Sequence, residues 1–374
     1  MFVVGAAMFY TGLAQAIGEK VVHIFGTGEN SLMLGLMLVG TALSSVLSNT
    51  GTCACLMPVA LGICAASKNT ASRQLLPMAY ACGWGGIITL VGTPPNIIGS
   101  GALTAAGLPG FSFFEFAWIG IPLSVAGILY MLLIGKYLLP KAELDADQEI
   151  EQEIEATTHD KKKQVISGVI LLACVTVMAL NLKFISLEMT AIIGALVCVL
   201  TGCLTEKQAY SSIDWVTIFL FAGMMPVSTA MDKTGAGKLI ANWAVGLMGG
   251  EPTPLIVTIV LFSISCFLTQ FMSNTASAAL LCPIGIAIAK QLNADPKAVV
   301  MAIAVAASCA FATPVGTPPC TLVLGPGGYK FMDYVKCGTG LVLLCRRGNM
   351  IRMKVLTAYN MLYFLAPGRM KSVL

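Results

Sequence analysis

Long apolar segments fill most of this 374-residue chain. A helix needs roughly 20 apolar residues to cross a bilayer, and several segments reach that length. The chain is 57% hydrophobic and only 11% charged, whereas soluble domains carry about 25% charged residues. A membrane β-barrel would require segments of alternating polarity, and the sequence has no such alternation. We therefore predict an all-α polytopic membrane protein, with apolar segments near residues 1–17, 31–66, 74–108, 113–139, 164–182, 186–204, 213–231, 254–291, 297–325 and 335–345.

Four of these segments contain an internal polar or proline-containing break. Ser-Asn-Thr occurs at 48–50 and again at 273–275, and a Gly-Thr-Pro-Pro sequence occurs at 92–95 and again at 316–319. Proline and the residue before it end helices for steric reasons. Ser-Asn-Thr alone could be an ordinary N-cap between two membrane helices. Because both breaks occur twice, we favour a binding site, and we expect the two halves to bring the four breaks together at the midplane of the membrane.

The breaks repeat at matched spacing. Thr93 follows Asn49 by 44 residues, and Thr317 follows Asn274 by 43. Residues 2–22 also align with 220–240. These matches indicate an internal duplication. Each Ser-Asn-Thr segment has two apolar arms, so it returns to its starting side of the membrane as a hairpin. We count five crossings between the two hairpins. Because five is odd, we predict that the second half is inverted with respect to the first, as in many secondary transporters.

A charged stretch separates the two halves. Residues 141–163 hold eight acidic side chains and four lysines. This predicts a first repeat at 1–140, a linker at 141–163, a second repeat at 164–345 and an atypical basic tail at 346–374. Lys68, Arg73 and Lys136 fall on the side of the linker, and the positive-inside bias places that side in the cytoplasm. No basic face is available for nucleic acid, and the thirteen cysteines lack the spacing of a metal site.

Broken helices within the membrane are suited to binding ions. Their free N–H groups and carbonyls are tolerated only where protein buries them or where they line a watered cavity. Helix N-termini favour anions, and free carbonyls favour hard cations. No charged residue falls near the middle of an apolar segment, which favours Na⁺ over H⁺ as a coupling ion. We also expect a bound anion to meet no cationic side chain.

The duplicated breaks resemble those of the divalent anion/sodium symporter (DASS) family, within the wider ion transporter superfamily. Members of that family carry di- and tricarboxylates and sulfate. The resemblance covers roughly residues 2–336. It implies two inverted-topology repeats with re-entrant helical hairpins and broken helices, homodimers, and an elevator motion of the hairpin-bearing domain.

The resemblance also implies ligands at particular positions. A first Na⁺ site would comprise Ser44, Ser48, Asn49 and the Gly92 carbonyl. A second would comprise Thr269, the Met272 carbonyl, Asn274 and the Gly316 carbonyl. The substrate-binding residues would be Asn49, Thr50, Thr93, Ser273, Asn274, Thr275, Thr317 and Pro318.

The chain departs from the family pattern in three places. Cys320 stands at the end of the second Gly-Thr-Pro-Pro break, where the family usually has Asn. Met1 falls inside a segment that matches a spanning helix, so we expect the chain to be truncated at the N-terminus. The basic residues from Arg346 onward replace an expected apolar helix, so we expect the C-terminus to be altered.

Taken together, these features predict a multi-pass transporter of the cell membrane and not an enzyme. We expect Na⁺-coupled symport of a small divalent anion, with a C4-dicarboxylate as the leading substrate, and no cofactor besides the coupling Na⁺. The expected partners are the anion, Na⁺, the lipid bilayer and a second copy of the chain. The alternatives left open are an anion exchanger, a sulfate carrier or an ion/H⁺ antiporter of the same superfamily, and a membrane fragment that does not transport.

Overall fold

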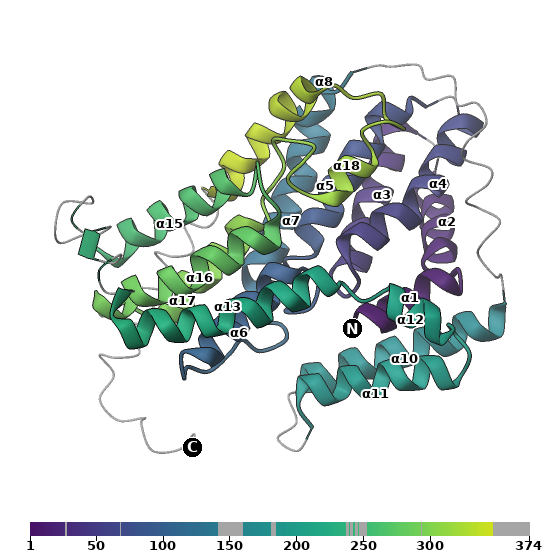
Figure 1. The fold of residues 1–374 in the computed structure, drawn as a ribbon. Helices are drawn as coiled ribbons and strands as arrows, with labels where there is room; N and C mark the ends of the chain where they lie inside the picture. Colours follow the sequence, from purple (N-terminus) through teal and green to yellow (C-terminus); the bar gives the residue numbers. More distant parts are fainter. Residues whose placement is uncertain are drawn as a thin grey trace, which may run out of the picture.

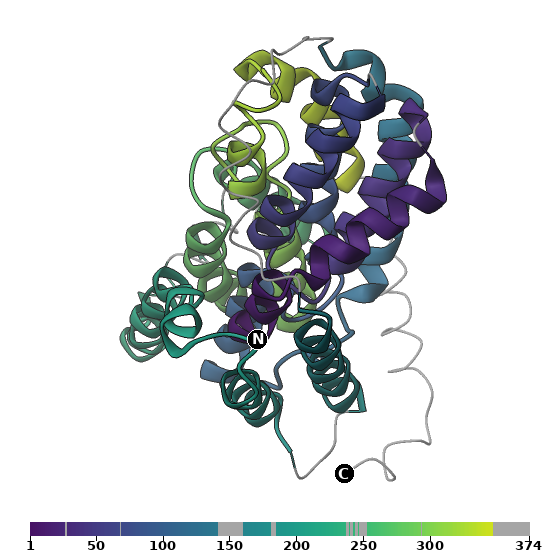
Figure 2. The same ribbon diagram turned by 90° about the vertical axis from the view of Figure 1, so that its right-hand side faces the viewer.

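The computed structural model describes residues 1–26, 28–67, 69–140, 160–180, 185–236, 253–292 and 294–346, with a few positions between 239 and 246. All regular structure in these residues is helical. Figures 1 and 2 show the helices from two directions. They are α1 (Phe2–Tyr10), α2 (Leu13–Phe25), α3 (Glu29–Ser44), α4 (Asn49–Ser67), α5 (Leu75–Gly85), α6 (Pro94–Ala105), α7 (Ala117–Tyr130), α8 (Lys136–Leu138), α10 (Lys161–Leu180), α11 (Leu187–Leu200), α12 (Glu206–Ser211), α13 (Trp215–Thr234), α15 (Pro254–Leu268), α16 (Asn274–Gln291), α17 (Pro296–Ala307) and α18 (Pro318–Leu322). A 3-10 helix, η1 (Ala71–Arg73), precedes α5, and a π-helical segment, η2 (Met131–Gly135), joins α7 to α8 in one long helix.

Several helices present an apolar surface to the outside. Within the described residues, Asn49–Ser67, Ala117–Leu138 and Lys161–Leu180 are each long and apolar enough to cross a membrane. Leu133, Leu172 and Leu200 are among the large apolar side chains left exposed on η2, α10 and α11. Such a surface would be costly in water, whereas lipid covers it without that cost. The exposed helices therefore fit an integral membrane protein.

Both Ser-Asn-Thr segments lie at the tips of helical hairpins, as the sequence predicts. In the first hairpin α3 ends at Ser44 and α4 begins at Asn49, and in the second α15 ends at Leu268 and α16 begins at Asn274. Ser48 Oγ accepts a hydrogen bond from Gly51 N, and Ser273 Oγ accepts one from Ala276 N. The N-cap interpretation is therefore correct for the two serines.

Both Gly-Thr-Pro-Pro segments interrupt a helix. Between α5 and α6, and again between α17 and α18, an extended threonine (Thr93 or Thr317) precedes a helix that begins with proline. Proline is suited to the first turn because its missing N–H would have no partner there. Pro94 and Pro318 thus fix where the second part of each broken helix begins.

The repeat is less regular in the first apolar segment. Residues 1–17 do not form one helix: α1 ends at Tyr10, and α2 begins after Gly12, whose φ of 73° a glycine adopts without strain. Thr11 Oγ1 donates to Ala7 O at 2.8 Å and lies 3.0 Å from Ser167 Oγ. The aligned segment α13 continues through residues 215–234. The first apolar segment is therefore divided between two helices.

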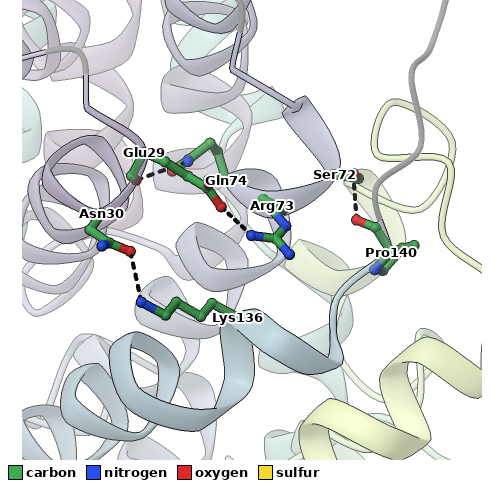
Figure 3. A network of polar contacts seen from close by, with 7 residues as sticks. All are labelled: Glu29, Asn30, Ser72, Arg73, Gln74, Lys136 and Pro140. Atoms are coloured by element: carbon green, nitrogen blue, oxygen red, sulfur yellow. Dashed lines mark hydrogen bonds and ion pairs between the residues drawn. The ribbon is translucent and has the colours of Figure 1, made fainter.

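Polar contacts tie the base of the first hairpin to the end of the first half (Figure 3). Arg73 pairs with Glu29 at 2.5 Å, and Lys136 Nζ donates to Asn30 Oδ1 at 3.1 Å. Ser72 Oγ donates to Pro140 O at 2.8 Å. Arg73 and Lys136 therefore lie on the same side of the molecule, as the positive-inside argument requires. The linker residues 141–159 and the tail residues 347–374 lie outside the described residues, so the predicted domain limits stay predictions.

The two halves pack against each other through their broken helices. Helix α6 of the first half contacts α16 and α17 of the second, and α18 of the second half contacts α4 and α5 of the first. Tyrosine hydroxyls join the halves as well: Tyr80 donates to Phe311 O at 2.8 Å, and Tyr329 donates to Ser72 O at 2.6 Å. The arrangement is consistent with two inverted repeats whose breaks meet in the interior.

Candidate functional site

The four breaks meet at one cavity of about 1280 Å³. Both hairpin tips and both Gly-Thr-Pro-Pro breaks line it, which confirms the predicted convergence. The predicted site residues on its wall are Ser48, Asn49, Thr50, Gly92, Thr93, Ser273, Asn274, Thr275, Thr317 and Pro318. Ser44 and Thr269, both fully buried, lie behind the tips, where they meet the two asparagines.

Oxygen atoms cluster around Asn49. Ser44 Oγ lies 2.6 Å from Asn49 Oδ1 and 2.7 Å from the carbonyl oxygen of Cys82. The carbonyl oxygens of Cys82 and Gly92 each lie 3.1 Å from the same end of the Asn49 amide. With its nitrogen turned to this cluster the amide donates to all three oxygens, and with its oxygen turned inward it becomes a fourth ligand for a cation.

The same cluster recurs around Asn274. Thr269 Oγ1 lies 2.8 Å from Asn274 Oδ1 and 2.6 Å from the carbonyl oxygen of Ala307. The carbonyl oxygen of Gly316 lies 2.9 Å from the same end of the amide, and that of Ala307 lies 3.0 Å from it. Each half therefore gathers one hydroxyl, one amide and two carbonyls at the equivalent place.

Helix ends of opposite polarity are sorted between the clusters and the cavity. The first cluster lies where α3 and α5 end, and the second where α15 and α17 end. The negative ends of two helix dipoles thus converge behind each tip, which favours a cation. The N-termini of α4, α6 and α16 instead begin at residues of the cavity wall or next to it. Free N–H groups and the positive dipole ends there favour an anion.

Gly86 makes room for the first cluster, and Gly85 lets α5 pack closely against the end of α3. A methyl group on Gly86 would overlap the Asn49 side chain, and one on Gly85 would lie 2.6 Å from the carbonyl oxygen of Thr41. Gly86 was not among the predicted site residues. Its position in a Gly-Trp-Gly-Gly run just before the break was the available signal.

Two predicted cation ligands have other described contacts. The Ser48 hydroxyl caps α4 and lines the cavity. Met272 N donates to Leu268 O at 3.1 Å, and none of the described contacts joins the Met272 carbonyl to the Asn274 cluster. The structure adds the carbonyls of Cys82 and Ala307 to the two clusters, and the roles of Ser48 and Met272 stay predictions. Cys82 and Ala307 were missed because any residue type supplies a carbonyl, so sequence gives no sign of it.

The departure at Cys320 changes the chemistry but keeps a tether. In the first break Asn96 Nδ2 donates to Thr89 O at 2.8 Å. In the second break the neighbouring Thr321 Oγ1 donates to Pro314 O at 2.6 Å. In each bond the donor lies seven residues after the acceptor. The Thr321 hydroxyl, one position after Cys320, therefore makes a bond like that of the Asn96 amide in the first break. Cys320 itself is fully buried.

A charged pair lies on the cavity wall, contrary to our expectation. Lys297 Nζ, at the start of α17, pairs with Glu115 Oε1 at 2.8 Å, and both residues line the cavity. Lys297 also lies over the Phe111 ring, 5.4 Å from its centroid. Glu188 and Asp214 line the same cavity. A cationic side chain therefore lies on the cavity wall, where we expected none, and whether it contacts the anion stays a prediction. Lys297 is at the end of its apolar segment, and only the fold brings that end to the cavity.

An apolar outer surface and an interior cavity formed by broken helices of both halves are features of membrane transporters. The fold is that of the YdaH transporter of Alcanivorax borkumensis, whose solved structure matches 96% of this chain and 85% of the other chain, with a TM-score of 0.59 at 15% identity.

The family follows from the sequence comparisons. A family model described as "Citrate transporter" matches residues 1–278 and 177–372. An uncharacterized transporter of Haemophilus influenzae is 34% identical over 363 residues, which cover 92% of this chain and 77% of the relative. The sodium-dependent dicarboxylate transporter SdcS of Staphylococcus saprophyticus is 24% identical and is matched over 98% of this chain and 75% of its own length. The chain belongs to the citrate transporter family, and these matches bear out its resemblance to DASS permeases.

Proposed function

We propose that this chain couples the influx of Na⁺ to the uptake of a small divalent anion, with a C4-dicarboxylate as the leading substrate. The observation that carries the proposal is the sorting of helix ends. Cation-favouring C-termini and oxygen clusters lie behind the two hairpin tips, while anion-favouring N-termini lie at the cavity. One asparagine in each half, Asn49 or Asn274, belongs to an oxygen cluster and also lines the cavity.

The geometry supplies a physical basis for coupling. Asn49 lines the cavity and also belongs to its oxygen cluster, as Asn274 does in the second half. A cation in the cluster would turn the amide oxygen inward, so the amide nitrogen would face the cavity and could donate to a carboxylate. The cation would also add a positive charge close to the anion. Each solute would therefore raise the affinity of the other, which is the reciprocity that linkage requires.

The comparisons support this substrate class. Relatives named sodium-dependent dicarboxylate transporter SdcS occur in Staphylococcus saprophyticus and in Staphylococcus aureus, the latter at 26% identity. The family model is described as a citrate transporter. All of these solutes are small carboxylates with more than one negative charge, and the cavity is large enough for them.

Uptake of labelled succinate into proteoliposomes tests the proposal. We expect uptake that requires an inward Na⁺ gradient and that choline cannot support. Exchange of internal for external succinate without Na⁺ would indicate an anion exchanger, and uptake driven only by a pH gradient would indicate H⁺ coupling. Uptake of labelled sulfate that unlabelled succinate does not inhibit would indicate a sulfate carrier. No transport in any of these assays would indicate a non-transporting membrane fragment.

The homodimer and the elevator motion are part of the same proposal. In that arrangement the apolar outer surface would include the contact between two copies, and the hairpin-bearing helices α3–α6 and α15–α18 would move together against the others. The linker 141–163 would face the cytoplasm of the cell membrane. Crosslinking in membranes and labelling of single cysteines placed in the linker would test these points.

A further inference from the structure

Two buried hydroxyl groups lie at equivalent positions of the two halves and have no hydrogen-bond partner among the described residues. They are Thr52 Oγ1 on α4 and Ser277 Oγ on α16. Both residues are fully buried. Thr52 follows Asn49 by three residues, and Ser277 follows Asn274 by three. The repeat therefore places an unsatisfied hydroxyl three residues after the asparagine of each cluster.

Two other buried helical hydroxyls among the described residues are satisfied by the carbonyl four residues earlier. Ser124 Oγ donates to Gly120 O at 2.7 Å, and Thr190 Oγ1 donates to Ser186 O at 3.1 Å. The carbonyls of Ser48 and Ser273 are available in the same way to Thr52 and Ser277, and they already accept the backbone N–H of those residues at 3.0 Å. Neither hydroxyl donates to the carbonyl four residues earlier. A buried hydroxyl without a partner is unfavourable, and here the unfavourable arrangement occurs at equivalent positions of both halves.

The position on the helix relates each hydroxyl to a cluster. Residues three apart lie on the same side of a helix, with Cβ atoms about 5–6 Å apart. The Asn49 side chain is directed to the hydroxyl of Ser44 and the carbonyls of Cys82 and Gly92, so Thr52 stands one turn further along the same side of α4. Ser277 has the same relation to Asn274 on α16. Hard cations gather several oxygen ligands, and a hydroxyl oxygen beside the cluster can supply one more.

We propose that Thr52 and Ser277 are further Na⁺ ligands, one for each half of the transporter. The inference rests on the proposed function, because it takes the two clusters to be Na⁺ sites. The Thr52 hydroxyl belongs with Ser44, Asn49 and the Gly92 carbonyl. The Ser277 hydroxyl belongs with Thr269, Asn274 and the Gly316 carbonyl. Each hydroxyl is left without a protein partner because its partner is the transported cation.

Removal of each hydroxyl at nearly constant shape tests the inference. In proteoliposomes, Thr52→Val and Ser277→Ala should each raise the Na⁺ concentration for half-maximal succinate uptake by roughly 3- to 10-fold, as expected for loss of one polar ligand. The KM for succinate at saturating Na⁺ should stay within about twofold. A second readout needs no transport: in detergent without succinate, Na⁺ should raise the Tm of each variant less than that of the parent protein, with choline chloride as the ionic-strength control.

Matched variants separate cation binding from packing. Ser124→Ala and Thr190→Val remove buried hydroxyls that are satisfied within α7 and α11, so they should leave the Na⁺ response unchanged. Thr52→Ser keeps the hydroxyl and should show the Na⁺ response of the parent protein. If Thr52→Val does not fold, Ser277→Ala still tests the inference. An unchanged Na⁺ response in Thr52→Val and Ser277→Ala, or an equal loss in the control variants, would overturn the inference while the proposed function stands. If the parent protein itself shows neither Na⁺-dependent uptake nor stabilisation by Na⁺, the proposed function fails, and the inference fails with it.

Discussion

Asn49 and Asn274 have the same surroundings in the two halves. Each amide reaches behind its hairpin tip to one hydroxyl and two backbone carbonyls, and each residue also lines the cavity. An amide carries both a donor and an acceptor, so one side chain can contact an oxygen-bound cation and a carboxylate at the same time. A hydroxyl carries its donor and its acceptor on the same atom, and an ionised carboxylate has no donor, so neither could contact both solutes in this way.

Replacement of either asparagine should therefore abolish coupled transport. We expect Asn49→Ala and Asn274→Ala each to lower Na⁺-driven succinate uptake by about tenfold or more, because each loses hydrogen bonds to charged groups. Membrane insertion, measured by extraction and gel filtration in detergent, should be unchanged. Retained Na⁺-driven uptake in both variants would show that the tips are only helix caps.

Gly86 gives a steric test of the first cluster. A methyl group there would overlap the Asn49 side chain, so Gly86→Ala should displace the amide at a cost of about 1–3 kcal/mol. We expect a lower apparent Na⁺ affinity in the uptake assay. Gly62→Ala on α4 is the control, because nothing lies within 4 Å of its added methyl group. Equal Na⁺ affinity in both variants would argue against a tightly packed cluster.

At the scale of elements, broken helices place dipole ends of opposite polarity at the oxygen clusters and at the cavity. Helices α3, α5, α15 and α17 end at the oxygen clusters, while α4, α6 and α16 begin at the cavity or beside it. Contacts between breaks keep these ends in place: Thr313 Oγ1 donates to Gln270 O at 2.5 Å, and in the first half Thr89 Oγ1 donates to the equivalent Ser45 O. A continuous helix would satisfy its own carbonyls and could not provide either kind of end.

The start of α17 adds a fixed charge to the cavity. Lys297 is about one-third exposed and paired with Glu115, which is about one-quarter exposed. Lys297→Gln removes a positive charge and should raise the KM for succinate by roughly 3- to 10-fold, whereas Glu115→Gln removes a negative charge and should lower it. The effects should be no larger, because an exposed charge interacts by only about 1 kcal/mol. Both effects should shrink at high ionic strength. Lys330→Gln, at an exposed position away from the cavity lining, is the control, and an unchanged KM in Lys297→Gln would show that the pair is purely structural.

At the scale of the whole molecule, the site depends on how firmly the two halves are joined. Tyr329 OH donates to Ser72 O and accepts a hydrogen bond from Leu76 N at 2.9 Å, so one hydroxyl of the second half satisfies two backbone groups of the first. Tyr80 and Tyr130 each donate to a backbone carbonyl of the second half, on Phe311 and Cys337. These bonds span more than 200 residues of sequence, and they hold the two sets of breaks against one cavity.

Loss of the Tyr329 hydroxyl should destabilise the molecule without touching the cavity. Tyr329→Phe leaves the backbone groups of Ser72 and Leu76 without their partner, at a cost of about 1–3 kcal/mol. We expect a lower Tm in detergent and an unchanged Na⁺ concentration for half-maximal uptake. Tyr137→Phe, at a position where the side chain is mostly exposed, should leave the Tm unchanged. Equal Tm values for the two variants would contradict the proposed role of Tyr329.

Several features of this protein were determined by the sequence alone. Apolar length and low charge fix an all-helical membrane fold, because lipid cannot satisfy backbone polar groups in any open structure. Proline and the Ser-Asn-Thr tripeptides fix where helices end, since these effects are local and steric. The duplicated spacing predicted that the breaks would meet. The repeat also indicated which positions would be equivalent, as the clusters around Asn49 and Asn274 show.

Only the tertiary structure decided which atoms face one another. The carbonyls of Cys82 and Ala307 belong to the two clusters, and the sequence did not predict them because every residue type has a carbonyl. Ser48 instead caps α4, and none of the described contacts joins the Met272 carbonyl to its cluster. The position of Lys297 beside Glu115 was decided by the packing of two halves that are far apart in sequence, as was the Tyr329 bridge. The break after Tyr10 followed from Gly12 and from the contact of Thr11 with Ser167, 156 residues away. Local chemistry thus set the ends of the helices, and long-range packing set what those ends surround.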